Sequence, residues 1–599
     1  MTLLSSPLTQ PSGLGAHPGP DGTTFRLWST RARNAALVVY DQGGPQLRPL
    51  QAAGEGLFEA TFADLGPGTR YKFELDGEVY PDPYARWLPE GVHGPATVWE
   101  SRYTFRHAPV RRESGELVIY ELHVGTFTPE GTYRAAAQRL PHLRDLGVTA
   151  IELMPLSAFP GTRGWGYDGV AHFAPFVPYG PPEDLQAFVD EARGHGLVVL
   201  LDMVYNHFGP DGNYLGAYSP EYFNSDEHTP WGPAPDFAQP WMRRLALDSA
   251  EHWLRAYGFD GFRLDATHAL VDPSSRHILE ELSATVREAG QARGVPTFVF
   301  CEDERNLPAL VSDIGATGVW ADDFHHLVRV TLTGEQDGYY AAYRPDVAEL
   351  ARCIERGWLY EGQPWPLSGE ARGQAAEALE APAFVYCIQN HDQIGNRAVG
   401  DRLQATAGRD GFLAASALLL FLPMTPLLFQ GQEWMASTPF QFFSDFPGEL
   451  GEAVTRGRLA EFSGFEAFAR PGGQAAVPDP QAPATFEHSQ LNWAEPEQEE
   501  HAQVLALYRR LLALRREDPV LRRSTRAGLR AGAEGALLWV ERRHEGSRRL
   551  LLVNVGHEAQ ALGTLALGGA RELLRTTGEP EAPLTTVPPR SAVLLAWDQ

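Results

Sequence analysis

The pattern of apolar and polar residues changes twice along the chain and predicts three successive regions. From residue 20 to about 100, short alternating segments such as TTFRLWS, AALVVYD and TRYKFELDG are separated by Gly, Pro and Asp turns, which is typical of a small β-sandwich. From about residue 115, buried apolar strands alternate with amphipathic helices. Near the end, GALLWVERR and RRLLLVNVG flank an EG turn, and SAVLLAWD forms a last strand. This end predicts a small all-β domain.

The middle region contains eight strand candidates, each followed by polar residues or a helical pattern. They are LVIYELHV from 117, VTAIELMP from 148, GLVVLLDMV from 196, FDGFRLDA from 259, TFVFCED from 297, GVWADDF from 318, FVYCIQNHD from 384 and TPLLFQGQE from 425. Among the helices between them, WMRRLALDSAEHWLRAYG places Leu247, Ala250, Leu254 and Tyr257 on one face and ends at Gly258. Eight alternating strands and helices predict a (β/α)8 barrel.

We therefore predict an α/β fold, a (β/α)8 TIM barrel flanked by an N-terminal and a C-terminal β-sandwich. The expected domains are residues 1–110, 111–525 and 526–599. A Gly- and Pro-rich insertion at about 204–240 follows the third strand, and a loop of that length is usually functional, here as a lid or cleft wall. The apolar run Phe412–Leu422 is short enough to be a buried helix and does not predict a membrane span.

Composition narrows the function further. The 599 residues carry 50 Lys and Arg against 76 Asp and Glu, a formal charge of -26, which disfavours nucleic acid and anionic membrane surfaces as partners. The three cysteines, Cys301, Cys353 and Cys387, are too few for a disulfide framework or a four-ligand zinc site. With no signal-like apolar segment at its start, the chain is expected to be cytoplasmic.

Polar residues gather at the ends of the predicted strands. Side chains at the carboxyl ends of barrel strands converge on one face, and there the sequence has Asp202, Asn206, His207, Arg263, Asp265, His268, Glu302, His391 and Asp392. Each alone could cap a helix or form a structural ion pair, but burying so many charges without function would be costly. Asp265 and Glu302, on adjacent strands, meet the minimum for glycoside hydrolysis: one carboxylate attacks or activates water, and the other protonates the leaving oxygen.

Four of these segments resemble the ordered motifs of the α-amylase superfamily of glycoside hydrolases. They are DMVYNH at 202–207, GFRLDATH at 261–268, the Glu of FCED and NHDQ at 390–393. The resemblance implies that Asp265 is the nucleophile, Glu302 the general acid/base and Asp392 the transition-state stabiliser. It also implies that Arg263 keeps Asp265 ionised and that the sugar is held by Tyr167, Asp168, Asp202, His207, His268, Asn390, His391, Gln393 and Asn396.

Other segments are similar to one family within that superfamily, the maltooligosyltrehalose trehalohydrolases. They are GFRLDATHALVDPSSRHILEEL, EDERN at 302–306, WADDFHHLVRVTLTGEQDGYY at 320–340 and NHDQIGNRAVGDRL at 390–403, and the likeness spans nearly the whole chain. In that family an HHLVR-like segment lines the sugar site, which adds His325, His326 and Arg329 as substrate-binding candidates. The alternative is a structural helix start that the preceding DDF caps.

The function expected from the resemblance is that of a retaining α-glycosidase. It would hydrolyse the α-1,4 bond adjoining the terminal trehalose unit of maltooligosyl trehalose, releasing trehalose and a maltooligosaccharide, with related α-glucans as further ligands. The alternatives are a glycogen branching enzyme and a glycan-binding protein on an inactive barrel, which would not need the carboxylate pair. Asn206 occupies a calcium-ligand place of some amylases, but residues 211–220 lack a carboxylate cluster. No metal and no cofactor are expected, and the sequence does not reveal the oligomeric state.

Overall fold

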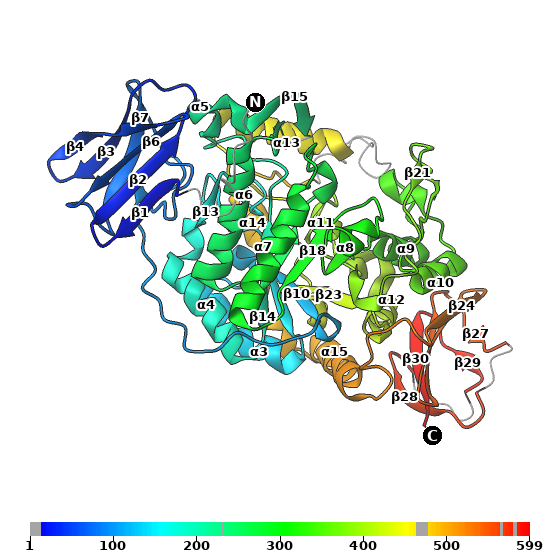
Figure 1. The fold of residues 1–599 in the computed structure, drawn as a ribbon. Helices are drawn as coiled ribbons and strands as arrows, with labels where there is room; N and C mark the ends of the chain where they lie inside the picture. Colours follow the sequence, from blue (N-terminus) through cyan, green and yellow to red (C-terminus); the bar gives the residue numbers. More distant parts are fainter. Residues whose placement is uncertain (1–12, 230–231, 463–476, 564–566, 579–583, 599) are drawn as a thin grey trace.

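The computed structural model places a barrel between two β-rich domains. It describes residues 13–229, 232–462, 477–563, 567–578 and 584–598. Figure 1 shows the N-terminal sandwich in blue and the C-terminal sheets in red at opposite ends of the molecule. Parts of all three predicted domains, including the residues before 13 and residue 599, lie outside the described residues.

Eight parallel strands close the central barrel in chain order, as predicted from the apolar runs. They are β10 (Ile119–Leu122), β11 (Ala150–Leu153), β14 (Val198–Met203), β17 (Gly261–Leu264), β18 (Phe298–Glu302), β19 (Gly318–Trp320), β22 (Phe384–Tyr386) and β23 (Thr425–Phe429). The barrel closes where β23 pairs with β10, with Leu427 opposite Ile119. The strands are buried almost throughout because side chains fill the inside and helices cover the outside.

Amphipathic helices surround the strands. The longer ones are α4 (Pro182–Gly194), α6 (Pro240–His252), α7 (Ile278–Arg293), α9 (Asp322–Thr333), α10 (Val347–Arg356), α12 (Leu403–Phe421) and α15 (Glu499–Glu517). The helix predicted to end at Gly258 does end there, in the left-handed conformation, but its last turn, Trp253–Tyr257, is π-helical. The predicted apolar run forms most of α12. Within the described part of the chain, no helix combines the length and the apolar character needed to span a membrane.

The N-terminal domain is a sandwich of two antiparallel sheets. One contains β1 (Gly15–Gly19), β2 (Gly22–Trp28), β6 (Leu57–Phe62) and β5 (Gln51–Gly54); the other contains β4 (Gly44–Pro49), β3 (Ala35–Asp41), β7 (Arg70–Leu75) and β8 (Glu78–Tyr80), with β9 (Ala96–Thr97) beside β7. Phe25, Leu37, Tyr71 and Phe73 are almost fully buried in its core.

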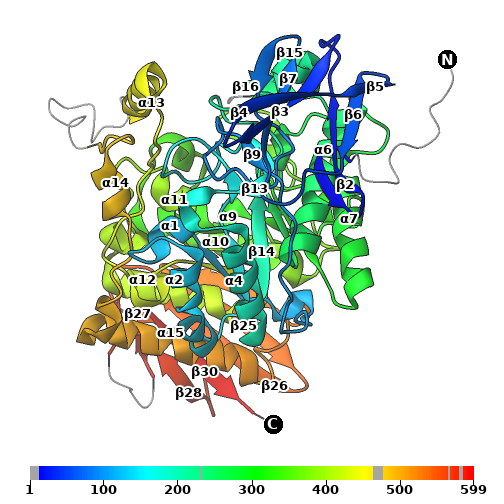
Figure 2. The same cartoon turned by 90° about the vertical axis from the view of Figure 1, so that its left-hand side faces the viewer.

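The C-terminal domain confirms the predicted hairpin and last strand. Its five-stranded sheet runs β24 (Arg530–Glu534), β25 (Leu537–His544), β26 (Ser547–Asn554), β30 (Ser591–Trp597) and β28 (Arg571–Arg575), and a two-stranded sheet pairs β27 (Gln560–Ala561) with β29 (Thr586–Val587). Glu545 and Gly546 connect β25 to β26 with φ angles of 47° and 82°, which is the left-handed pair of a type I′ hairpin turn. Figure 2 shows this domain and α15 at the end of the barrel opposite the sandwich.

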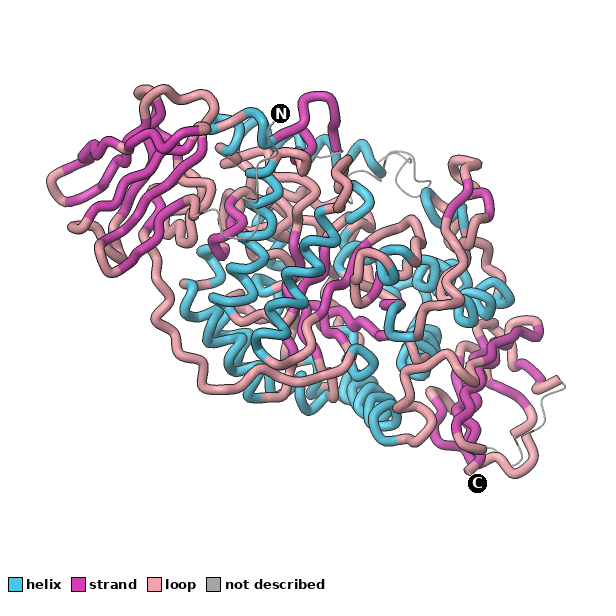
Figure 3. Tube along the Cα trace, viewed as in Figure 1, coloured by secondary structure: helices cyan, strands magenta, loops and turns pink. Residues whose placement is uncertain are grey.

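The insertion after β14 contacts the N-terminal sandwich. It contains α5 (Leu215–Tyr218) and the hairpin of β15 (Phe223–Thr229) and β16 (Gly232–Pro235), while residues 230–231 lie outside the described chain. Ser29 Oγ donates to the Tyr218 carbonyl at 2.6 Å, and the hydroxyls of Tyr84 and Tyr222 are 3.1 Å apart. Figure 3 shows the hairpin of this segment at the upper edge of the barrel. The structure thus gives the insertion a docking role, and its role as a lid stays a prediction.

Candidate active site

Arg263, on β17, is the centre of a charged cluster at the carboxyl ends of the barrel strands. Its Nη1 lies 2.6 Å from Asp202 Oδ2 and 2.9 Å from Asp265 Oδ1, and its Nη2 lies 2.8 Å from Glu302 Oε2. The guanidinium is fully buried and stands 4.5 Å from the centre of the Trp320 ring. One cation therefore joins carboxylates from three neighbouring strands, because parallel strands deliver their ends to the same face.

Asp265 is held as an ionised carboxylate. Burial raises its pKa, but the charges of Arg263 and His207 and the hydrogen bond from Asn206 outweigh burial and lower it. Asn206 Nδ2 donates to Asp265 Oδ2 at 2.7 Å and to the Asp265 carbonyl at 2.8 Å. A carboxylate that is kept ionised, and whose oxygens are held in place by hydrogen bonds, is suited to attack carbon.

Glu302 has the opposite electrostatics although it shares the same arginine. Burial and the nearby charges of Asp265 and Asp392 raise its pKa well above the ordinary range, and together they outweigh Arg263. The backbone N–H of Ala266 donates to Glu302 Oε2 at 2.8 Å, from a residue in the left-handed region with a φ of 39°. A carboxyl with a raised pKa thus lies beside one with a lowered pKa, which is the arrangement of an acid and a nucleophile.

His391 and Tyr167 extend the cluster on its other side. Their rings stack with centres 5.1 Å apart, and Tyr167 Oη lies 2.7 Å from His391 Nε2 and donates to Asp202 Oδ2 at 2.6 Å. Burial lowers the pKa of His391, but the carboxylates of Asp392 and Glu121 raise it to about 10. Asp392 Oδ1 lies 3.4 Å from His391 Nε2.

The helix that carries Asp392 is fixed by its own first residues. Asn390 caps α11 (His391–Gly395) by accepting from the Gln393 backbone N–H at 2.8 Å, and Asn396 donates to Asp392 Oδ1 at 3.2 Å. The sequence-predicted Asn390, Gln393 and Asn396 therefore lie around Asp392. Burial raises the pKa of Asp168, next to Tyr167, to about 6.

Four other predicted residues lie on exposed surface or have partners outside this cluster. His268 is exposed in the turn after β17. On α9, His325 Nε2 lies 3.1 Å from Asp322, His326 stacks on Tyr343 with ring centres 4.8 Å apart, and Arg329 donates to Glu335 at 2.6 Å. Asp322 and Asp323 form the first turn of α9, as the helix-start alternative expects. The sugar-site assignment of these side chains stays a prediction.

Two buried glutamates inside the barrel were missed by sequence reasoning. Glu121 on β10 accepts from the His391 backbone N–H at 3.0 Å and contacts His391 Nδ1, and Glu152 is its partner in register on β11. The available signal was an acidic residue within an otherwise apolar strand, in LVIYELHV and in VTAIELMP. Such a residue is expensive to bury and is therefore informative.

The donor set around Asn206 does not provide a cation site. The Asn206 amide nitrogen donates to Asp265, and its oxygen contacts His207 Nδ1. Among the residues that the structure describes, no three or more His, Cys, Asp or Glu side chains are grouped so that they could hold a metal ion.

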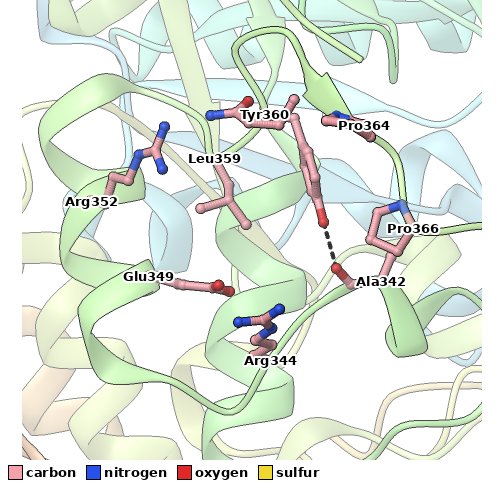
Figure 4. A pocket seen from close by; sticks show the side chains of 9 residues that line it. Ala342, Arg344, Glu349, Arg352, Leu359, Tyr360, Pro364 and Pro366 are labelled. Carbon is pink, nitrogen blue, oxygen red and sulfur yellow. Dashed lines mark hydrogen bonds between the residues drawn. The ribbon is translucent and has the colours of Figure 1, made fainter. Parts of the chain in front are cut away.

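Several cavities lie outside the charged cluster, and two of them are lined by residues that follow Glu302 in the chain. Figure 4 shows one of about 270 Å³, lined by Ala342, Arg344, Glu349, Arg352, Leu359, Tyr360, Gln363, Pro364 and Pro366. It contains none of the predicted site residues. The other, of about 490 Å³, is lined by Glu304, Arg305, Leu307, Trp365, Ser368, Glu370, Ala371, Arg372, Gly373 and Gln374. Its first lining residue follows Glu302 by two positions, so this cavity adjoins the cluster along the chain.

Comparison with known proteins finds family models that match three stretches of the chain. Family models match a carbohydrate-binding module 48 (isoamylase N-terminal domain) at residues 13–85, an alpha amylase catalytic domain at 78–229 and a domain of unknown function at 524–595. A crystal structure of an alpha-amylase-like protein from Salmonella typhimurium is 38% identical, with a TM-score of 0.89, over 98% of this chain and 100% of that one. These matches confirm the predicted barrel and its flanking β domains.

Relatives of known name separate the candidate families. Malto-oligosyltrehalose trehalohydrolase of Deinococcus radiodurans is 53% identical over 574 residues, which cover 95% of this chain and 94% of that protein. A 1,4-alpha-glucan branching enzyme of Nocardia farcinica is 34% identical over 290 residues, only 43% of this chain and 39% of that enzyme. The branching-enzyme alternative is therefore matched in part, whereas the first match is nearly complete. The chain belongs to the malto-oligosyltrehalose trehalohydrolase family of α-amylase-type glycoside hydrolases.

Proposed function

We propose that the protein hydrolyses the α-1,4 bond adjoining the terminal trehalose unit of malto-oligosyl trehalose and retains the anomeric configuration. The observation that carries the chemistry is the pair of carboxyls on Arg263: Asp265 is kept ionised, while burial raises the pKa of Glu302. The near-complete match to the trehalohydrolase of Deinococcus radiodurans supports the substrate.

In the first step, Asp265 attacks the anomeric carbon on the non-reducing side of the scissile bond. Glu302 gives its proton to the oxygen of the leaving trehalose, and a covalent glycosyl-enzyme forms. In the second step, Glu302, now ionised, takes a proton from water as that water attacks the same carbon and releases Asp265. Two inversions at one carbon give overall retention.

The remaining groups hold the sugar and the charge that develops on it. We assign Asp392 to stabilising the positive charge of the ring in the transition state and Tyr167 to stacking on that ring. The sugar hydroxyls are assigned to Asp168, Asp202, His207, Arg263, His268, His325, His326, Arg329, Asn390, His391, Gln393 and Asn396. Of these, Arg263 also keeps Asp265 ionised.

The expected selectivity follows from the shape of trehalose. Its two glucoses are joined through both anomeric carbons, so the end of the substrate is bent and non-reducing. A site that hydrogen-bonds hydroxyls found only in that geometry rejects a straight chain strongly, whereas an apolar surface would reject it weakly. We therefore expect the bond next to trehalose to be cleaved much faster than any bond in plain maltooligosaccharide.

The test is to compare maltotriosyl trehalose with maltopentaose, which have the same number of glucose units. Chromatography should show free trehalose and maltotriose from the first substrate, with a specificity constant at least about 100-fold above that for the second. Equal specificity constants for the two substrates would contradict the proposed selectivity and indicate a general amylase activity. Incubation with amylose separates the branching alternative, because only that activity creates new α-1,6 bonds.

A further inference from the structure

Two glutamates lie side by side beneath the charged cluster, and the mechanism above uses neither. Glu121 on β10 and Glu152 on β11 are paired in register inside the barrel, and both are buried. Both Glu121 oxygens contact His391: Oε2 accepts from the backbone N–H, and Oε1 is in short contact with Nδ1. By contrast, neither Glu152 oxygen has a hydrogen-bond partner among the described residues.

The donors and acceptors around Tyr167 show that His391 Nε2 carries a proton. The single proton of Tyr167 goes to Asp202 Oδ2, an oxygen that also accepts from Arg263. The Tyr167 oxygen can therefore only accept from His391 Nε2 at 2.7 Å, so Nε2 must carry a proton. A second proton lies between His391 Nδ1 and the Glu121 carboxyl. The His391 ring and the Glu121 carboxyl therefore hold two protons between them, one on Nε2 and one shared along the Nδ1 contact.

The protein environment decides where that second proton resides. Burial lowers the pKa of His391, but Asp392 and Glu121 raise it to about 10, so the ring keeps both protons at neutral pH. Burial, with the charges of Glu121 and Asp202, raises the pKa of Glu152 well above its ordinary range. Two adjacent buried carboxyls cannot both ionise cheaply, and Glu152, which has no hydrogen-bond partner among the described residues, is the neutral member. Glu121 instead accepts from the His391 backbone N–H at 3.0 Å.

We infer that Glu121 is a positioning residue: its carboxylate fixes His391 as an imidazolium whose Nε2–H points to Tyr167 and Asp392. This inference rests on the proposed function, since the fixed cation lies beside the groups that carry the chemistry. Several charged and titratable groups surround His391: His123 just after β10, Glu152 from β11, Tyr167, Asp202 from β14, Arg263 from β17, Asp265 just after β17, and Asp392 from α11. Arg263 and His391 are thus the two cations among these carboxylates.

The consequence for catalysis is electrostatic. An imidazolium 3.4 Å from Asp392 Oδ1 places a fixed positive charge beside that carboxyl and holds its direction. If Glu121 became an amide, either Nδ1–H or the backbone N–H of His391 would face an NH2 group. His391 would then lose an acceptor and the charge that favours its second proton.

The experiment compares Glu121→Gln with Glu152→Gln, the same substitution at paired positions on adjacent strands. For Glu121→Gln we expect kcat on maltotriosyl trehalose to fall about tenfold or more at pH 7.5, with KM changed less than about threefold, and to recover partly towards pH 6. The alkaline limb of kcat should begin at lower pH than in the wild type. For Glu152→Gln we expect kcat within about threefold and an unchanged profile, because an amide replaces a carboxyl that is already neutral.

A second readout does not depend on turnover. In protein labelled with 15N-histidine and assigned with His391→Gln, the His391 ring should show two protonated nitrogens at pH 8 in the wild type and lose one in Glu121→Gln. A neutral His391 ring in the wild type at pH 8 overturns the inference, even if Glu121→Gln does not fold. Equal losses in both glutamine variants, or a loss with an unchanged pH profile, also overturn it, because a packing defect would explain them. If the wild type does not hydrolyse malto-oligosyl trehalose, the proposed function fails while the ring measurement still decides the inference.

Discussion

Replacing Asp265 by Asn tests the nucleophile with the smallest change of shape. The carboxylate accepts from two donors, Arg263 Nη1 at 2.9 Å and Asn206 Nδ2 at 2.7 Å. An amide has one accepting oxygen, so one of these donors would face an NH2 group. Losing one charge-assisted hydrogen bond in a buried site costs about 1.5–3 kcal/mol. The variant should therefore fold with modestly reduced stability.

The catalytic loss should be far larger than the loss of stability. An amide does not form the glycosyl-enzyme, and removing a nucleophile typically lowers kcat by about 10⁴-fold or more, equivalent to about 5.5 kcal/mol of transition-state stabilisation. Substrate affinity should change by less than about threefold, because the amide keeps the shape and most contacts of the carboxylate.

The assay follows trehalose release from maltotriosyl trehalose, and calorimetry with the inactive variant measures substrate binding. Asp313→Asn, an exposed carboxylate after β18, serves as the matched control and should retain wild-type rates. Residual activity of Asp265→Asn within about tenfold of wild type would refute the assignment of the nucleophile. Loss of binding together with activity would instead mean that the substitution disrupts the site.

Three further predictions follow from the same geometry. Glu302→Gln should be severely impaired, azide should partly restore turnover of substrates with good leaving groups, and an inverted product by anomeric NMR would rule out double displacement. Tyr167→Phe removes the hydroxyl that donates to Asp202 and should lower kcat/KM by about 10- to 100-fold, and unchanged kinetics would contradict its place in the site. Burial lowers the pKa of His17 to about 4 and of His252 to about 3. Between pH 6.5 and 4 the unfolded chain therefore binds more protons than the folded protein does. The free energy of unfolding should fall as pH falls through this range. Thermal unfolding at pH 5 and at pH 7 measures this loss of stability. The loss should be smaller in His252→Gln, and an equal loss in that variant would contradict the role given to His252.

The barrel was predictable because parallel strands are buried on both faces and therefore read as apolar runs. All eight predicted segments contain an observed strand. The cluster around Arg263 was predictable for a related reason: Asp202, Asp265 and Glu302 come at or just after strand ends, and those ends meet on one face. The opposite pKa shifts of Asp265 and Glu302 could not be predicted from the sequence, because they depend on burial and on which carboxylates contact Arg263.

The contact between Glu121 and His391 could not be read from the sequence. The two residues are 270 positions apart and meet only because β10 and the start of α11 face the same interior. For the residues of α9, the sequence suggests a role that the contacts in the structure do not by themselves support. The motif likeness places His325, His326 and Arg329 in a sugar site, but the structure gives each of them a partner within the protein: Asp322 on the same helix, and Tyr343 and Glu335 beyond its end. Sequence similarity alone does not separate the two interpretations.

The docking of the N-terminal sandwich on the insertion has a consequence for domain exchange. The insertion contains Asn206 and His207 near its start, and it carries Tyr222 to Tyr84 of the sandwich. A foreign carbohydrate-binding module grafted in place of the sandwich would meet a surface shaped for another partner, and a misfit there would pull on the chain that positions Asn206, the donor to Asp265. The unit that can be transplanted between relatives is therefore the sandwich together with the insertion, and recombination breakpoints placed between them should be selected against.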